Sequence, residues 1–219
     1  MRLRPLLLAL ASLSATVPAA AQGYGGGQSG PRPLLARERE IVLARSAAPA
    51  AVSDSATVYA LTATGYEIAV RGTNGAACYV SRDWIESLEP HCFDAEGAAT
   101  IMRMHIRRVE LLHQGKTLAV ADREVADGLA SGVFRLPRRP AVSYMLSAAQ
   151  QLMSDDGRKV GAWKPHLMIY YPYLTSVDVG LTGTEAQGLV VVDSGKPTAN
   201  LMVVVPDFVQ PRSAPAAQR

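Results

Sequence analysis

The sequence lacks most of the local patterns on which a functional assignment usually rests. It has two cysteines, two tryptophans and three phenylalanines among 219 residues. It contains no GxSxG or SxxK serine pattern, no HExxH zinc pattern, no P-loop and no EF-hand loop. These absences count against the common types of serine hydrolase, zinc protease, nucleotide-binding enzyme and calcium sensor. They count only modestly, because catalytic groups can be dispersed along a chain.

No apolar run is long enough to cross a bilayer, but the chain begins as a secretory leader does. Arg2 and Arg4 precede a short apolar run at 6–13, and Ala19-x-Ala21 supplies the small residues of a cleavage site. We predict a signal peptide cut near Ala21 and an exported protein, periplasmic or extracellular and most simply bacterial. No cysteine follows the cleavage site, so a lipid anchor is not indicated.

The charge of the mature chain is close to balanced. Loss of Arg2 and Arg4 reduces the 22 basic residues to 20, against 19 acidic ones, so the formal net charge falls from +3 to +1. This gives no case for a nucleic-acid partner. Acidic residues gather at 83–96 and basic residues in the middle of the chain: Arg103, Arg107, Arg108, Arg123, Arg135, Arg138 and Arg139. The two groups either neutralise one another in the fold, or Arg138 and Arg139 hold an anionic ligand such as a lipid head group or wall polymer.

The two cysteines, Cys78 and Cys92, are expected to form a disulfide, because an even pair in an oxidising compartment is most simply bonded. On the chain-entropy model, closing a loop of this size stabilises the fold by about 3 kcal/mol. Two free thiols remain the alternative. A reduced Cys92 with His166 as its base would make a cysteine hydrolase.

Composition divides the chain into four parts. We expect a signal peptide at 1–21, a flexible linker at 22–33, a single domain at 34–206 and a disordered tail at 207–219. The linker contains Gly25-x-Gly27-x-x-Gly30, which matches the dinucleotide-binding fingerprint in letters. That fingerprint needs a strand before it and a helix at its third glycine, whereas here a cleaved leader precedes and two prolines follow. We therefore expect no cofactor.

Hydrophobic periodicity predicts an α+β fold: a mostly antiparallel sheet with two central helices and a short N-terminal helix. The short helix is expected at 34–46. Alternation over 57–81 predicts a three-stranded antiparallel meander, with turns at Thr64-Gly65 and Asn74-Gly75. A two-residue loop at Asn74-Gly75 would pair Val70 with Tyr79 and Arg71 with Cys78.

The central helices are expected at about 95–114, capped by Asp94, and at 118–131, ended by Gly132. Hairpin turns are expected at Asp156-Gly157 and Ser194-Gly195. The remaining strands are predicted at 141–147, 150–154, 158–163, 166–171, 189–193 and 201–205.

The stretch KPHLMIYYPYL, 164–174, holds the best candidate site residues. In a strand, His166 shares one apolar face with Met168 and Tyr170, which indicates a central strand covered on both sides. At the rim of the sheet His166 could act as a base or bind a ligand, or it could simply bond a backbone carbonyl. The candidate binding residues are His166, Tyr171, Tyr173, Arg138 and Arg139, with His166 also a weak catalytic candidate.

No metal site is expected. HCFDAEG at 91–97 places His91, Cys92, Asp94 and Glu96 together, but capping accounts for Asp94 and the disulfide for Cys92. His105 and His113 lie eight residues apart on the predicted helix. That is about 12 Å along its axis, too far for both to hold one metal.

Four stretches carry a resemblance: EREIVLARSAAPAAVSDSATVYAL, GYEIAVRGTNGAACYV, RPAVSYMLS and KPHLMIYYPYL. Together they resemble a group of exported bacterial proteins of unassigned function, over most of the mature chain. The resemblance implies no activity and no catalytic residue. Where that group has an aromatic or larger apolar residue after NG, this chain has Ala76-Ala77, which bears on packing at the hairpin tip. The 57–81 segment is also similar in pattern to a bacterial SH3-like half-barrel.

Three functional hypotheses follow. The first is a non-catalytic domain that binds a small or envelope-derived ligand. This hypothesis rests on the expected disulfide, the aromatic strand and the lack of an assembled catalytic motif. The second is a hydrolase acting on an envelope substrate with His166 as base. The third is a purely structural envelope protein.

Overall fold

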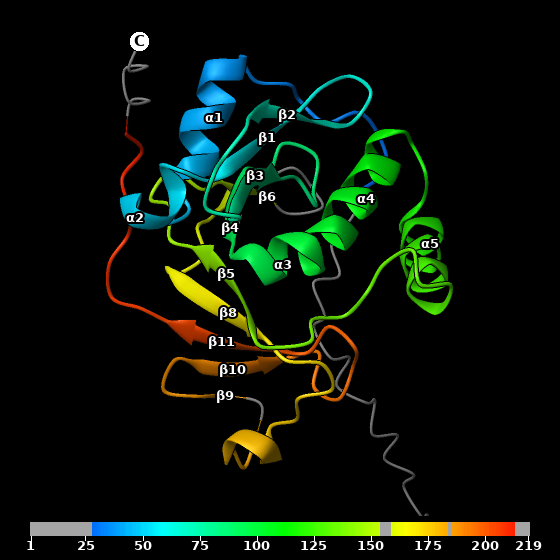
Figure 1. Ribbon diagram of the computed structural model, residues 1–219, viewed down its shortest axis with the longest axis vertical. Coiled ribbons are helices and arrows are strands. Elements are labelled where there is room, and N and C mark those ends of the chain that lie inside the picture. Colours follow the sequence, from blue (N-terminus) through cyan, green and yellow to red (C-terminus); the bar gives the residue numbers. More distant parts are fainter. Residues whose placement is uncertain (1–27, 154–158, 184, 213–219) are drawn as a thin grey trace, which may run out of the picture.

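The chain folds as α+β around one large mixed sheet, as the sequence predicts (Figure 1). The computed structural model describes residues 28–212, except 154–158 and 184. The predicted signal peptide, linker residues 22–27, the Asp156-Gly157 turn and tail residues 213–219 lie outside the described residues.

The helices and strands agree in place with most of the predicted ones. The helices are α1 (Arg37–Arg45), α2 (Ala50–Ser53), α3 (Ala95–Ala99), α4 (Ile101–His113), α5 (Leu118–Ala130) and a 3₁₀ turn at Val177–Val179. The strands are β1 (Thr57–Leu61), β2 (Tyr66–Val70), β3 (Ala77–Ser81), β4 (Glu89–Phe93), β5 (Ala141–Met145), β6 (Leu152–Met153), β7 (Lys159–Gly161), β8 (His166–Tyr170), β9 (Glu185–Ala186), β10 (Leu189–Val192) and β11 (Asn200–Val204).

Nine of these strands form the large sheet, in the order β2-β1-β3-β4-β5-β8-β11-β10-β9, while β6 and β7 pair separately. Neighbours in the large sheet run antiparallel, except β1 and β3, which are parallel. β8 therefore lies inside the sheet, between β5 and β11. Its His166, Met168 and Tyr170 are buried on one face, whereas Leu167 and Ile169 are half-buried on the other.

The predicted meander over 57–81 is wrong in its second half. β1 and β2 form the expected hairpin, but β3 joins the opposite edge of β1, so Cys78 lies beside Val58 and not beside Arg71. The chain leaving β2 crosses the start of β1 at Gly72. A Cβ atom there would lie 2.2 Å from the backbone nitrogen of Thr57, so only glycine allows this crossing.

Asn74-Gly75 is part of this crossing and not a two-residue hairpin loop. The side chain of Asn74 donates to the carbonyl of Val52 and accepts from the backbone N–H of Ala76. The backbone N–H of Thr73 donates to the carbonyl of Ser55. These bonds connect the turn to α2 and to the start of β1. They form in place of the two-residue hairpin that the sequence predicts at Asn74-Gly75.

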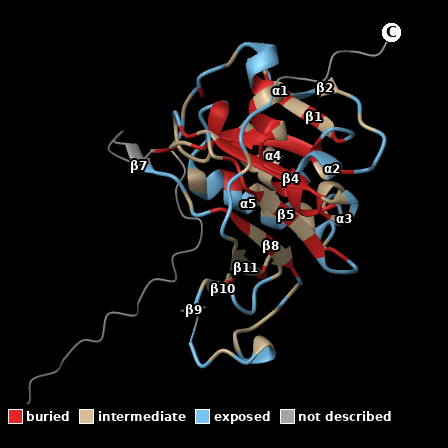
Figure 2. Cartoon of the chain, turned by 90° about the vertical axis from the view of Figure 1, so that its left-hand side faces the viewer, coloured by how far each residue is buried: buried red, intermediate tan, exposed pale blue. Residues whose placement is uncertain are grey.

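The sheet carries helices on both faces and a hydrophobic core on each. α1 packs on β1, β3 and β4, and its core contains Leu43, Ala44, Val58 and the two cysteines. On the other face, α3 and α4 pack over a core that includes Tyr79, Phe93, Ile101, Met102 and Met168, and α5 packs against α4. Figure 2 shows the buried residues gathered around β4 and α4, with mostly half-buried or exposed residues toward β9 and β10.

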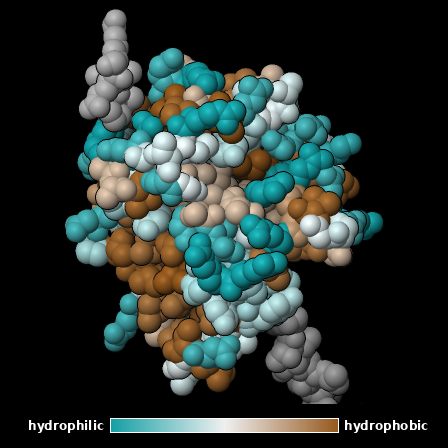
Figure 3. All heavy atoms as spheres, in the orientation of Figure 1, coloured by the Kyte–Doolittle hydropathy of each residue, from teal (hydrophilic) through white to brown (hydrophobic). Residues whose placement is uncertain are grey.

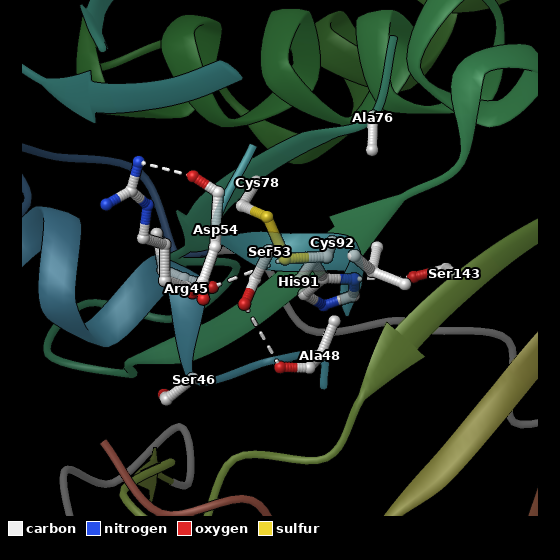
Figure 4. Close-up of a disulfide and its surroundings, with 12 residues drawn as sticks. Arg45, Ser46, Ala48, Ser53, Asp54, Ala76, Cys78, His91, Cys92 and Ser143 are labelled. Carbon is white, nitrogen blue, oxygen red and sulfur yellow. Dashed lines mark hydrogen bonds between the residues drawn. A yellow bond between two sulfur atoms is a disulfide. The ribbon is translucent and has the colours of Figure 1, made fainter. Parts of the chain in front are cut away.

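The predicted disulfide is present. Cys78 of β3 and Cys92 of β4 face each other directly across the two antiparallel strands, and both are fully buried. Figure 4 shows this bond beside Ala48 and Ser53 of the N-terminal layer. A covalent link thus fixes the register of β3 and β4 beneath α1. It is consistent with an oxidising compartment.

The helix predicted at 95–114 is interrupted. Asp94 caps α3 as expected, its Oδ1 accepting the N–H of Gly97 at 2.7 Å. Thr100 then leaves helical geometry, at φ −127° and ψ −88°, and α4 starts afresh at Ile101. The second predicted helix, ended by Gly132, agrees with α5.

The described end of the predicted linker is not flexible. The backbone N–H of Arg32 donates to Nδ1 of His113 at 2.8 Å, and its guanidinium donates to the carbonyls of Arg82 and Asp83. The N–H of Gly30 donates to the carbonyl of Leu112. Residues 30–32 therefore lie across the C-terminal end of α4 and the loop after β3, where an arginine side chain and two backbone amides find partners.

The described start of the predicted tail is also docked. Val209 accepts from the N–H of Ala148 and donates its own N–H to the carbonyl of Leu146. Arg212 pairs with Asp54 at 3.2 Å. A short parallel bridge and an ion pair thus connect the described start of the predicted tail, up to residue 212, to the domain.

Candidate functional site

The sequence-predicted site residues do not come together. Ala141 pairs with Tyr170, so Arg138 and Arg139, before β5, lie at the same end of the sheet as Tyr171 and Tyr173, after β8. His166 begins β8 and lies at the opposite end of the sheet. The four residue steps from His166 to Tyr170 span about 13 Å. A single site using all five residues is not formed.

His166 is buried in the core. Its Nδ1 donates to the carbonyl of Lys164 at 2.6 Å, which leaves the proton-accepting lone pair on Nε2. Nε2 is buried and has no hydrogen-bond partner, and burial lowers the pKa of the ring below its usual 6.5. The nitrogen has the protonation state of a base, but a substrate has no visible path to it.

Tyr171 and Tyr173 are exposed at 53% and 58%, and their rings stand on the surface. Arg138 and Arg139 both engage Glu96. Its Oε1 accepts the backbone N–H of Arg138 at 3.0 Å, and its Oε2 lies 3.4 Å from Nε of Arg139. The ion pair of Arg139 agrees with neutralisation of the acidic segment by the basic one, which was one of the two interpretations of these charges, whereas Arg138 contacts Glu96 through its backbone only.

A cavity of about 310 Å³ lies elsewhere, between α4, α5 and the face of the sheet formed by β4, β8 and β11. In Figure 1 the β10–β11 turn, in orange, lies below α4 and α5. The cavity wall consists of Asp83, His91, Met104, His105, Arg108, Asp122, Val125, Met168, Tyr170, Asp193, Thr198 and Asn200. The cavity brings together residues from distant parts of the chain.

Two histidines form its inner wall. His91 projects from β4 and His105 from α4, with ring centroids 6.4 Å apart. Burial lowers the pKa of His91 well below 6.5, and the nearby His105 and His166 lower it further. Burial also lowers the pKa of His105. Both rings are therefore uncharged at neutral pH, and each presents one donor and one acceptor nitrogen.

His91 and Ser143 form a buried polar pair, with His91 Nδ1 and Ser143 Oγ 3.4 Å apart (Figure 4). A serine beside a histidine resembles part of a nucleophilic site. However, Ser143 is fully buried under α3 and α4 and is not part of the cavity wall. The pair therefore satisfies two core polar groups and offers no accessible nucleophile.

A charged triad forms one rim of the cavity. The Arg108 guanidinium donates to Asp83 Oδ1 at 2.9 Å and to Asp122 Oδ1 at 2.8 Å. It thereby joins the loop after β3, α4 and α5. The two carboxylates raise the pKa of Arg108 against the opposing effect of burial, so the guanidinium stays charged.

The opposite rim is the β10–β11 turn. Asp193 has a left-handed backbone, at φ 53°, and its carboxylate pairs with Lys196 Nζ at 2.8 Å and accepts from Thr198. The next wall residue, Asn200, is 3% exposed, and its Oδ1 has no hydrogen-bond partner. The hairpin predicted at Ser194-Gly195 is present, and it places these polar groups against α4.

Glu89 lies on β4, two residues before His91 on the same face of the sheet, and is fully buried. Neither carboxyl oxygen has a hydrogen-bond partner of good geometry. Burial raises the pKa of Glu89 well above 4.5, Asp83 raises it further, and Trp163 and Arg108 act weakly in the other direction. The fold therefore favours the neutral form of this carboxyl, which lies in the core on the same strand as the wall residue His91.

Sequence reasoning missed most of this wall. It identified Asp83 and Arg108 only as members of an acidic and a basic segment, and it considered His105 only as a metal ligand together with His113. Asp193 and Asn200 carried no signal, because a lone polar residue at a strand end is common.

The described residues contain no group of three or more His, Cys, Asp or Glu side chains placed to hold a metal ion. Nor does any helix in the described part of the chain have the length and hydropathy to cross a membrane. No protein-family model matches the chain, and no curated protein or solved structure is significantly similar to it.

Proposed function

We propose that this is an exported protein that binds a small ligand without transforming it, in the cavity between α4 and the sheet. The observation that carries the proposal is the cavity wall, in which a buried side chain, Asn200, keeps an acceptor oxygen without a partner. An unmet buried acceptor is unfavourable in the empty protein, and a ligand donor would relieve it.

The size and lining support a small-molecule site. A volume of about 310 Å³ is at the lower end of ligand pockets, which span roughly 300–1,000 Å³. Met104, Val125 and Met168 supply apolar wall, and a few polar groups converge on it. Export is supported by the N-terminal leader pattern and by the disulfide.

Binding without turnover is favoured over hydrolysis by the state of the nucleophiles. Both cysteines are in the disulfide, Ser143 is buried away from the cavity, and the base-like nitrogen of His166 is enclosed. A hydrolase with His166 as base would need a substrate path that opens through the core.

The test is native mass spectrometry of the protein released from the periplasm, compared with its denatured mass. We expect the native protein to carry a discrete small-molecule increment. Val125→Trp, which fills the cavity from α5, should abolish that increment, and Val120→Trp on the exposed side of the same helix should keep it. An increment that Val125→Trp retains would place the ligand elsewhere, and a bare wild-type mass would favour a structural role.

A further inference from the structure

The charge of the cavity wall indicates the chemical class of its ligand. Three carboxylates, Asp83, Asp122 and Asp193, stand against one cation, Arg108, and both wall histidines are uncharged. Lys196 offsets Asp193 but lies outside the wall. The wall therefore has a negative excess, which attracts cations and repels anions.

The hydrogen-bonding capacity of the wall has the same bias. The donors of Arg108 are already directed at Asp83 and Asp122, and the hydroxyl of Thr198 donates to Asp193. The two uncharged histidines add one donor and one acceptor each, so the bias comes from the acceptors that remain: the buried Oδ1 of Asn200 and the unused lone pairs of the carboxylates. A ligand rich in N–H donors complements this wall, whereas a ligand rich in acceptors does not.

The rest of the wall suits the organic part of such a ligand. Met104, Met168 and Val125 are apolar, and Tyr170 contributes an aromatic ring packed against His105 with centroids 6.3 Å apart. Aromatic faces attract ammonium groups, and methionine adapts to ligands of varied shape. The volume corresponds to about ten water molecules at roughly 30 Å³ each, which is enough for a small monoamine.

We infer that the cavity takes a small organic ammonium compound, with its charged nitrogen between Asp122, Asp193 and Asn200 and its apolar part against Met104, Met168 and Tyr170. This rests on the proposed function and narrows it to one ligand class. It also departs from the anionic ligand that Arg138 and Arg139 suggested, since those residues lie outside this wall and engage Glu96.

The test is calorimetric titration of the wild-type protein with three probes of similar size: benzylamine, its close isostere benzyl alcohol, and the anion benzoate. We expect benzylamine to bind at least tenfold more tightly than benzyl alcohol, and benzoate more weakly than both. The preference for the amine should shrink between 20 mM and 500 mM salt, because salt screens the interaction between partly exposed charges. The Debye length falls from about 10 Å at 0.1 M to about 3 Å at 1 M.

Matched variants tie the preference to the named carboxylates. Asp122→Asn and Asp193→Asn should each remain folded, weaken benzylamine binding severalfold and weaken benzyl alcohol binding much less. Asp127→Asn, on α5 but outside this cavity wall, should bind benzylamine as the wild type does.

The outcomes separate the ligand class from the site itself. Equal binding of amine and alcohol, or tightest binding of benzoate, would overturn the ammonium inference while leaving the cavity as a binding site. Benzylamine binding that Val125→Trp does not reduce would place the amine outside the cavity and also overturn it. If none of the probes binds, the inference fails, and the native-mass comparison decides separately whether the cavity holds any ligand.

Discussion

The ion pair between Glu40 and Arg82 is the interaction whose removal we expect to cost most stability. Arg82 is 0% exposed and Glu40 1% exposed, and the guanidinium makes two parallel bonds to the carboxylate, at 2.8 and 2.6 Å. The pair joins α1 to the residue that follows β3. Burial is the largest single effect on Arg82 and lowers its pKa, but Glu40 and Tyr66 together outweigh it and hold the pKa above its ordinary value.

Glu40→Ala leaves a charged guanidinium in the core without its counter-ion. Breaking a buried pair by removing one partner costs about 3–5 kcal/mol. Since domains are stable by roughly 5–15 kcal/mol, this is a large share of the total free energy of unfolding. The double variant Glu40→Leu/Arg82→Met removes both charges and fills the space with apolar atoms, so its stability should return close to that of the wild type.

Urea unfolding followed by circular dichroism, with the disulfide kept intact, measures these differences. Asp54→Ala is the matched control, because it breaks an exposed ion pair: the side chain of Arg212 is 44% exposed and that of Asp54 is 42% exposed. This substitution should cost less than about 1 kcal/mol. A Glu40→Ala loss no larger than that of the control would refute the reasoning. So would a double variant as unstable as the single one, since the cost would then come from packing and not from an unpaired charge.

Three further predictions concern the cross-link, a buried acid and the strand crossing. Reducing the Cys78–Cys92 bond should lower the free energy of unfolding by about 3 kcal/mol, measured by urea unfolding with and without reductant, and the native thiols should resist alkylation until reduced. The fold raises the pKa of Glu89, so the stability that this carboxyl contributes is complete below about pH 4.5 and is lost as the pH rises. Glu89→Gln should therefore gain stability relative to the wild type between pH 5 and 8. A stability difference that does not change with pH would contradict this. Gly72→Ala should lower stability by roughly 2 kcal/mol or more, seen as a reduced urea midpoint, because its Cβ would collide with the backbone of Thr57.

The parts of the fold that local chemistry determines were predictable from the sequence. Asp94 caps α3 because a carboxylate before a helical segment accepts a first-turn N–H. Glycines end α4 and α5, and the even pair of cysteines forms a disulfide. In each case the residues that decide the outcome are close in sequence or unique in the chain.

The strand order could not be predicted in the same way. Asn74-Gly75 favours a hairpin locally, but α2 and the start of β1 offer Asn74 and Thr73 competing partners. Those partners exist only once the N-terminal segment has docked. A local turn preference is thus overridden by a tertiary contact, which single-sequence reasoning does not see.

The candidate site was hidden for a related reason. His91, His105, Asp122 and Asn200 come from four separate elements, and no pair of them has the spacing of a known motif. His166 attracted attention because it stands in an unusual stretch, yet its register in β8 places it in the core. Which polar residues share a cavity depends on how α4 and α5 lie across the sheet, and this is a property of the assembled layers.

The position of the cavity follows from a mismatch between those layers. α3 and α4 pack over β3, β4 and β5, while the sheet continues through β8, β11 and β10. Figure 3 shows hydrophobic residues gathered over that continuing part of the sheet. Where the helical layer ends, the sheet face is only partly filled, and the β10–β11 turn folds back to close it with Asp193, Thr198 and Asn200. A ligand there would contact both the helix-covered half of the sheet and the half that lies beyond the helices, so the cavity spans the edge of the helical layer.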